Sequence, residues 1–239
     1  MKEKLYTIPV NEAFNSDCEC PVCKMYQCLE KEAIEYTMGP SYMEDDIREM
    51  TNKSGFCAKH IKQLYGNQNR LGLALMLSTH MEKVIKDLSP MLKDVPKAPG
   101  LLKKKEEKPV TSYIKKIDTS CFVCDRIHKI FDRYLATILY LYRTEPEFQT
   151  VFKNCKGLCQ PHYGRLYEVA GMELSGNIYQ RFIQDLNELY LTNMKRMLED
   201  LTWLIDKFDY RNANEPWKNS KDALPRAIAK LNSVTIDED

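Results

Sequence analysis

The sequence predicts an all-α protein with two tandem helical repeats, each carrying a Cys3His metal site, and a long C-terminal helix. Three observations support this fold class. The alternation of β-branched and polar residues that marks strands is nearly absent. Apolar residues instead recur at steps of three and four residues, as they do on one face of a helix. A set of cysteine and histidine pairs also occurs twice along the chain.

The repeat is defined by four pairs of residues, each with two residues between its members. The two Cys-x-x-Cys pairs lie 101 residues apart, and the two Cys-x-x-His pairs lie 102 residues apart. A glycine and an apolar residue precede both Cys-x-x-His pairs, as Gly55-Phe56 and Gly157-Leu158. We interpret this common register as an internal duplication. The pairs are Cys20 and Cys23, Cys57 and His60, Cys121 and Cys124, and Cys159 and His162.

A proline-rich stretch separates the two halves of the sequence. It contains Pro90, Pro96, Pro99 and Pro109 together with a run of lysines and glutamates. Helices and central strands tolerate this composition poorly, so we expect a linker here. The predicted division is a first metal-binding helical repeat at residues 1–88, a linker at 89–112, and a second metal-binding repeat with a C-terminal extension at 113–239.

Each repeat is expected to contain three helices. A Cys-x-x-Cys pair opens the first helix, a short second helix follows, and a Cys-x-x-His pair opens the third after a loop. Two capping boxes predict the starts of the short helices, one formed by Ser41 with Glu44 and one by Thr144 with Glu147.

The clearest helical periodicity lies in the C-terminal part of the chain. It runs from Ser175 to about Phe208 and predicts one helix of roughly 50 Å. One further short helix is expected beyond Pro225.

The paired residues have the spacing of metal ligands. Two ligands three residues apart suit a tetrahedral ion, because one helical turn or a tight knuckle brings both side chains to the same side. Pro21 and Pro161 favour a first helical turn at their pairs. Free backbone amides in such a turn lower the pKa of a thiol and so favour the thiolate that binds metal. Three thiolates and an imidazole form a closed shell typical of structural zinc, so we predict two zinc ions. The predicted ligands are Cys20, Cys23, Cys57, His60, Cys121, Cys124, Cys159 and His162.

Several alternatives stay open at this point. Cysteine-rich shells with a histidine also hold iron, so an iron–sulfur cluster is the alternative cofactor. The cysteines could instead be small buried apolar residues. The pairs within one half of the sequence could share an ion, or pairs from different halves could do so. The loops between the two pairs of each half are 33 and 34 residues long, and this near equality favours pairing within each half.

The remaining cysteines and histidines lack a counterpart at ligand spacing. Cys18, Cys28 and Cys155 have no matching cysteine in the other repeat. Cys18 lies close to the first pair and could replace a ligand or act as a redox partner, although having no role is the simpler interpretation. His80 and His128 are expected to be surface or satisfied core residues.

Composition excludes several classes of protein. With 44% hydrophobic and 29% charged residues, a chain of 239 residues is expected to fold rather than stay disordered. The formal net charge of +1 gives no field that would attract nucleic acid. No apolar stretch approaches the roughly 20 residues of a membrane span, and residues 1–14 do not resemble a secretory signal. We therefore expect a cytoplasmic protein, in which nine cysteines favour metal binding over disulfides.

These motifs resemble those of an uncharacterised bacterial family, a domain of unknown function whose members are sometimes labelled substrate-binding proteins of ABC transporters. The resemblance covers the whole chain. It implies the ligand set given above and no particular mechanism. It rests on Cys20-Pro21-Val22-Cys23, Gly55-Phe56-Cys57-Ala58-Lys59-His60, Cys121-Phe122-Val123-Cys124, Gly157-Leu158-Cys159-Gln160-Pro161-His162, Tyr6-Thr7-Ile8-Pro9-Val10 and Phe208-Asp209-Tyr210-Arg211-Asn212.

The sequence favours a protein that is not an enzyme. It contains no phosphate-binding loop, nucleophile elbow or paired-carboxylate signature. The leading hypothesis is a helical module with two structural zinc sites that binds another macromolecule or has a regulatory role, with a protein as the favoured partner. The alternatives are a redox or iron–sulfur protein and a metalloenzyme in which a histidine is displaced from the metal.

Overall fold

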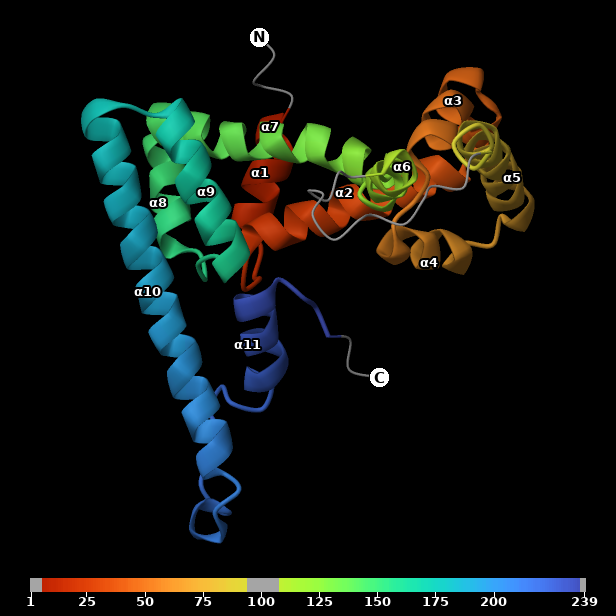
Figure 1. Ribbon diagram of the computed structural model, residues 1–239. Helices are drawn as coiled ribbons and strands as arrows, with labels where there is room; N and C mark the ends of the chain where they lie inside the picture. The colour runs from red at the N-terminus through yellow and green to blue at the C-terminus, as the bar shows by residue number, and fades with distance from the viewer. Residues whose placement is uncertain (1–5, 94–107, 237–239) are drawn as a thin grey trace, which may run out of the picture. The chain divides into compact units, whose positions relative to one another are not determined.

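The computed structural model describes residues 6–93 and 108–236, and all regular structure in these ranges is helical (Figure 1). No strand occurs in the described part of the chain, so the predicted all-α fold class is confirmed. The α-helices are α1 (Thr7–Phe14), α2 (Pro21–Met38), α3 (Asp45–Ser54), α4 (Ala58–Gly66), α5 (Arg70–Leu88), α6 (Pro109–Asp118), α7 (Phe122–Thr144), α8 (Pro146–Asn154), α9 (Gln160–Glu173), α10 (Gly176–Asp206) and α11 (Ala223–Asn232), and the 3-10 helices are η2 (Pro40–Met43) and η3 (Tyr210–Asn212).

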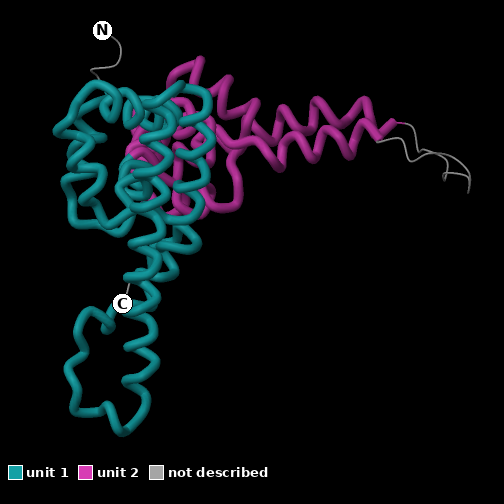
Figure 2. The backbone as a smooth tube through the Cα atoms, turned by 90° about the vertical axis from the view of Figure 1, so that its left-hand side faces the viewer, with its two compact units in different colours: residues 1–28, 131–239 teal, residues 29–130 magenta. Residues whose placement is uncertain are grey.

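The chain divides into two compact units (Figure 2). The first unit contains residues 1–28 and 131–239, and the second contains residues 29–130. The boundaries fall within α2 and within α7, so the units do not follow the order of the sequence.

The predicted linker at 89–112 lies only partly in the described residues. Helix α6 begins at Pro109, inside the stretch predicted as linker, and Pro109 occupies the first turn, where its missing amide hydrogen costs no hydrogen bond. Residues 94–107, with most of the lysine and glutamate run, lie outside the described residues. The division into two repeats around this linker stays a prediction.

The core of the first unit is built around a cluster of aromatic side chains. Phe14, Tyr142, Phe148, Phe152 and Phe182 are all buried, and they come from α1, α7, α8 and α10. The rings of Tyr142 and Phe182 pack edge to face, with centroids 4.9 Å apart. Such pairs contribute about 0.5–1.5 kcal/mol beyond the burial of their area. Tyr142 is therefore a core residue of the first unit rather than a surface tyrosine.

The core of the second unit includes buried residues of α2 and α7, such as Leu29 and Ile127, and the helices α3 and α5, which pack against each other. Ile47 and Thr51 are buried on α3, and Leu73 and Met76 are buried on α5. This packing holds α3 in place, and the Cys-x-x-His loop follows directly after its last residue.

The helix α10 confirms the long helix predicted from Ser175 to about Phe208. Ser175 takes the N-cap position with extended backbone, and the helix has 31 residues, or about 47 Å. Its buried face includes Phe182, Leu186 and Met197. Helices α9 and α11 both pack against α10 (Figure 1). The short helix predicted near Pro225 is α11.

The two predicted capping boxes are wrong. Glu44 and Glu145 are the N-cap residues of α3 and α8, and neither helix has a side-chain cap. The hydroxyls of Ser41 and Thr144 instead donate to backbone carbonyls of the preceding helices α2 and α7. The N-caps lie three residues after Ser41 and one residue after Thr144, so neither hydroxyl stands at the position from which it would cap the helix.

Candidate metal centres

The structure brings the eight predicted ligands together in two groups of four. The first centre consists of Cys20, Cys23, Cys159 and His162. Cys20 directly precedes α2 and Cys23 is its third residue, while Cys159 is the N-cap of α9 and His162 is the third residue of that helix. The centre therefore joins the amino-terminal ends of α2 and α9.

The second centre has the same construction. It consists of Cys57, His60, Cys121 and Cys124. Cys57 is the N-cap of α4 and His60 lies in the first turn of that helix, whereas Cys121 precedes α7 and Cys124 lies in the first turn. In both centres the second member of each pair is the third residue of its helix.

The motifs do not pair within each half of the sequence, although the loop lengths favour that pairing. Each centre combines a Cys-x-x-Cys pair from one half of the sequence with a Cys-x-x-His pair from the other half. The expectation that each half forms its own Cys3His site is therefore wrong. The length of a loop limits only how far apart the two ligand pairs at its ends can lie, and it does not bring them together. The helix that starts inside each Cys-x-x-Cys pair carries the chain away from it, by about 27 Å over the 18 residues of α2.

The spacing of the ligand atoms fits one tetrahedral ion in each centre. Metal–ligand bonds of about 2.3 Å to sulfur and 2.0–2.1 Å to nitrogen place tetrahedral ligand atoms roughly 3.5–3.8 Å apart. In the first centre Nδ1 of His162 lies 3.1, 3.3 and 3.7 Å from the sulfurs of Cys159, Cys23 and Cys20. In the second centre Nδ1 of His60 lies 3.3 Å from all three sulfurs. These donor sets can hold a metal ion without rearrangement of the helices.

The ionisable groups of the first centre pair a thiolate with an imidazolium. Hydrogen bonds from Cys20 and Cys23 lower the pKa of Cys159 far below that of a free thiol. Burial lowers the pKa of His162, but its hydrogen bonds to Cys159 and Cys23 outweigh burial and raise the pKa to about 9. A metal ion that binds Nδ1 must therefore displace a proton from His162 at neutral pH.

The second centre is electrostatically different. Burial raises the pKa of Cys57, but hydrogen bonds from the backbone amides of His60 and Lys59 and from neighbouring thiols outweigh it and lower the pKa. This is the effect expected of a cysteine at the start of a helix. Burial and the nearby thiols raise the pKa of Cys124 to about 12. Burial also lowers the pKa of His60, despite its contact with Glu30, so His60 is neutral at pH 7 and ready to bind metal.

The two histidines have different neighbours besides the thiols that face their Nδ1 atoms. Nε2 of His60 lies 3.1 Å from a carboxylate oxygen of Glu30, which is also 2.6 Å from Lys59. A carboxylate behind a ligating histidine fixes the orientation and the tautomer of the ring. In the first centre the ring of Phe131 instead lies against His162, with centroids 5.6 Å apart. Phe131 stands 101 residues after Glu30, which is the offset between the two Cys-x-x-Cys pairs.

A glycine with positive φ precedes each Cys-x-x-His pair by two residues. Gly55 has φ +59° and Gly157 has φ +81°. A Cβ atom on Gly157 would lie 3.0 Å from Cβ of Asn193 on α10, and one on Gly55 would lie 2.7 Å from the ring of His80. Both the backbone conformation and the close neighbour therefore require glycine at these turns.

We expect Gly157→Ala to lower the free energy of unfolding by about 1–2 kcal/mol, because alanine must adopt a left-handed conformation there. Gly164→Ala is the matched control, since Gly164 lies inside α9 with open space around it. That change is expected to stabilise the helix by about 0.5–1 kcal/mol. Urea unfolding of both variants checks the pair, and equal effects on stability would contradict the turn assignment.

The other cysteines and histidines belong to neither group of potential ligands in the described residues. The sulfur of Cys18 contacts the hydroxyl of Ser16 at 3.4 Å, and Cys28 is exposed. Burial raises the pKa of Cys155 to about 11. Nδ1 of His80 lies 2.8 Å from the carbonyl oxygen of Asn52, so His80 has the satisfied structural role that the sequence predicts.

Some residues of the candidate centres carry no signal in the sequence. Glu30 and Phe131 lie in the middle of helices, and no short motif sets them apart from the other residues there. The offset of 101 residues could have paired these two positions, but it could not have shown that they face the histidines.

The helical structure and the two Cys3His groups together characterise a helical protein that can hold two metal ions. The chain belongs to a family of unknown function, DUF6062, whose model matches residues 1–238. The predicted resemblance to an uncharacterised family is thereby confirmed. Comparison with curated proteins and with solved structures gave no match. None of the helices in the described residues has both the length and the apolar content that crossing a bilayer requires.

Proposed function

We propose that this is a cytosolic helical protein without catalytic activity, in which two structural zinc ions brace a surface that binds another protein. Three thiols and one imidazole converge in each centre, and this convergence is the main support for a bound metal ion. A shell of four protein ligands leaves no position for water or substrate, and this is the pattern of structural rather than catalytic zinc.

The short distances between ligand atoms support a single ion over an iron–sulfur cluster. All four ligand atoms of each centre lie within 4.8 Å of one another. A tetrahedral ion with bonds of about 2.3 Å places two sulfurs roughly 3.8 Å apart, and the sulfurs of Cys23 and Cys159 and of Cys57 and Cys124 lie 3.5 and 3.9 Å apart. In a [4Fe–4S] cluster each ligand binds a different iron, so the ligand atoms must spread further apart.

Zinc in these centres would act by joining segments that are distant in the sequence. In the first centre it would connect Cys23 with Cys159, whose sulfurs are 3.5 Å apart. In the second it would connect Cys57 with Cys124, at 3.9 Å. Because such shells do not exist in the unfolded chain, the free energy of metal binding contributes directly to folding.

A protein is the partner that the surface favours. The net charge of +1 provides no attraction for nucleic acid. Leu191, Leu198 and Ile205 of α10 are each more than half exposed and stand seven residues apart. Apolar residues at this spacing form one stripe on a helix, and such stripes are typical of contacts between proteins.

Purification without oxygen, followed by metal analysis and an absorption spectrum, tests the choice of metal. We expect a colourless protein that contains zinc, since Zn²⁺ has a filled d shell. A brown protein that contains iron and acid-labile sulfide would overturn the zinc assignment in favour of the iron–sulfur alternative.

A further inference from the structure

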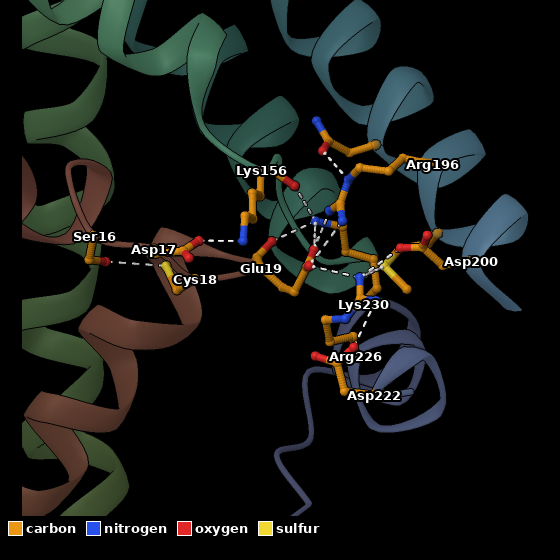
Figure 3. Close-up of polar contacts among 12 residues, drawn as sticks. Ser16, Asp17, Cys18, Glu19, Lys156, Arg196, Asp200, Asp222, Arg226 and Lys230 are labelled. Carbon is orange, nitrogen blue, oxygen red and sulfur yellow. Dashed lines mark hydrogen bonds and ion pairs between the residues drawn. The ribbon is translucent and has the colours of Figure 1, made fainter. Parts of the chain in front are cut away.

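The C-terminal helix α11 contributes a buried charge close to the first centre. The side chain of Lys230 is only 1% exposed. Its Nζ lies 3.2 Å from a carboxylate oxygen of Glu19, and the same carboxylate pairs with Arg196 and Arg226 (Figure 3). Burial lowers the pKa of Lys230, and the Glu19 carboxylate opposes this effect. A buried ammonium group of this kind needs a compensating partner.

Lys230 also holds the two backbone segments that carry the ligands of the first centre. Its Nζ donates to the carbonyl oxygen of Glu19 and to that of Lys156 (Figure 3). Glu19 directly precedes Cys20, and Lys156 stands three residues before Cys159. One side chain of α11 thus connects the backbone of both ligand pairs.

The second centre makes the corresponding connection by a direct hydrogen bond between its two ligand segments. There the hydroxyl of Ser120 donates directly to the carbonyl oxygen of Ser54, at 2.7 Å. Ser120 precedes Cys121 as Glu19 precedes Cys20, and Ser54 precedes Gly55 as Lys156 precedes Gly157. In the first centre Glu19 stands at the position of Ser120. There Lys230 of α11 connects the two ligand segments.

A second contact joins the end of α11 to a ligand itself. The hydroxyl of Ser233 lies 3.1 Å from the sulfur of Cys23. Ser233 is the C-cap of α11 and has a left-handed conformation. A hydroxyl that donates to a thiolate stabilises its negative charge.

We propose that α11 is a latch on the first centre, with Lys230 and Ser233 as positioning residues that retain the ion, and that loss of this ion releases α11. The inference rests on the proposed metal binding. A divalent ion with three thiolates leaves a net negative charge, which the buried ammonium of Lys230 can offset. A ten-residue helix is marginal by itself, so α11 depends on its contacts for stability. Metal loss would separate the segments of Glu19 and Lys156 and remove part of those contacts.

The test compares the rates at which the two ions leave the full-length zinc protein in the presence of a chromogenic chelator. We expect Lys230→Met to accelerate the loss of one ion by about tenfold or more and to leave the other unchanged, as for residues behind metal ligands. Lys221→Met is the matched control, because Lys221 is exposed in the loop before α11. Glu30→Gln should instead accelerate the loss of the other ion.

Amide hydrogen exchange provides a second measurement. It is made on the wild-type protein and therefore does not depend on the folding of a variant. Removing zinc from the wild-type protein should increase amide exchange in residues 223–232 by at least tenfold. Ser233→Ala removes only a hydroxyl. It should accelerate the release of the same ion as Lys230→Met does, by a smaller factor. The proposal would be overturned if amide exchange in α11 stayed unchanged after metal removal. It would also be overturned if Lys230→Met and the wild-type protein released both ions at equal rates. A wild-type protein that contains no metal would instead overturn the proposed function.

Discussion

Replacing Cys159 or Cys57 by serine is expected to lower the melting temperature by more than about 10 °C. Each substitution removes one of four ligands from a closed shell, and the free energy of zinc binding in small zinc domains is about 10–16 kcal/mol. Losing even several kcal/mol of this has a large effect, since 1 kcal/mol shifts the melting temperature of a chain of this size by about 2–4 °C. Calorimetry or circular dichroism measures the shift.

Cys28→Ser is the control for this experiment. Cys28 lies on α2 but is exposed and belongs to neither centre. We expect its melting temperature to stay within about 2 °C of the wild type, because exposed substitutions usually change stability by less than 0.5 kcal/mol. Equal melting temperatures for all three variants would refute the ligand assignment.

Stripping the metal from the wild-type protein is expected to have an effect of similar size without any substitution. A strong zinc chelator should lower the free energy of unfolding by several kcal/mol and increase amide exchange at the first turns of α2, α4, α7 and α9, because those turns carry the ligands. Hydrogen exchange and urea unfolding, before and after treatment, measure both effects.

Added zinc should restore the original stability, whereas magnesium and calcium should not. The latter are hard cations that take oxygen ligands, and the centres offer sulfur and nitrogen. If chelation removed all metal and left the unfolding curve unchanged, the ions would have no structural role.

Local sequence patterns predicted the ligand pairs and the helix starts at those pairs, because both depend on neighbouring residues. Pro21 and Pro161 fall in first turns, and the spacing of Cys-x-x-Cys and Cys-x-x-His places the second ligand at the third helical position. These features need only one turn of backbone, so a short stretch of sequence contains the information.

The pairing of the motifs could not be predicted in the same way. It depends on where α2 and α7 carry the chain, and therefore on the packing of helices that are far apart in sequence. Loop length gave the wrong answer because long helices, rather than flexible loops, occupy much of the 33 and 34 residues between the pairs. Lys230 and Glu30 were missed for a related reason, since each is a single charged residue on a helix whose role arises only from its tertiary neighbours.

The metal content of two double variants distinguishes the two ways in which the four ligand pairs could group. Cys20→Ser with Cys159→Ser removes two ligands from the first centre only, so after dialysis against a weak chelator this variant should retain one ion per chain. Cys20→Ser with Cys57→Ser damages both centres and should retain none. If the ligands instead grouped within each half of the sequence, the two results would be exchanged, and that exchange would contradict centres that each combine ligand pairs from both halves.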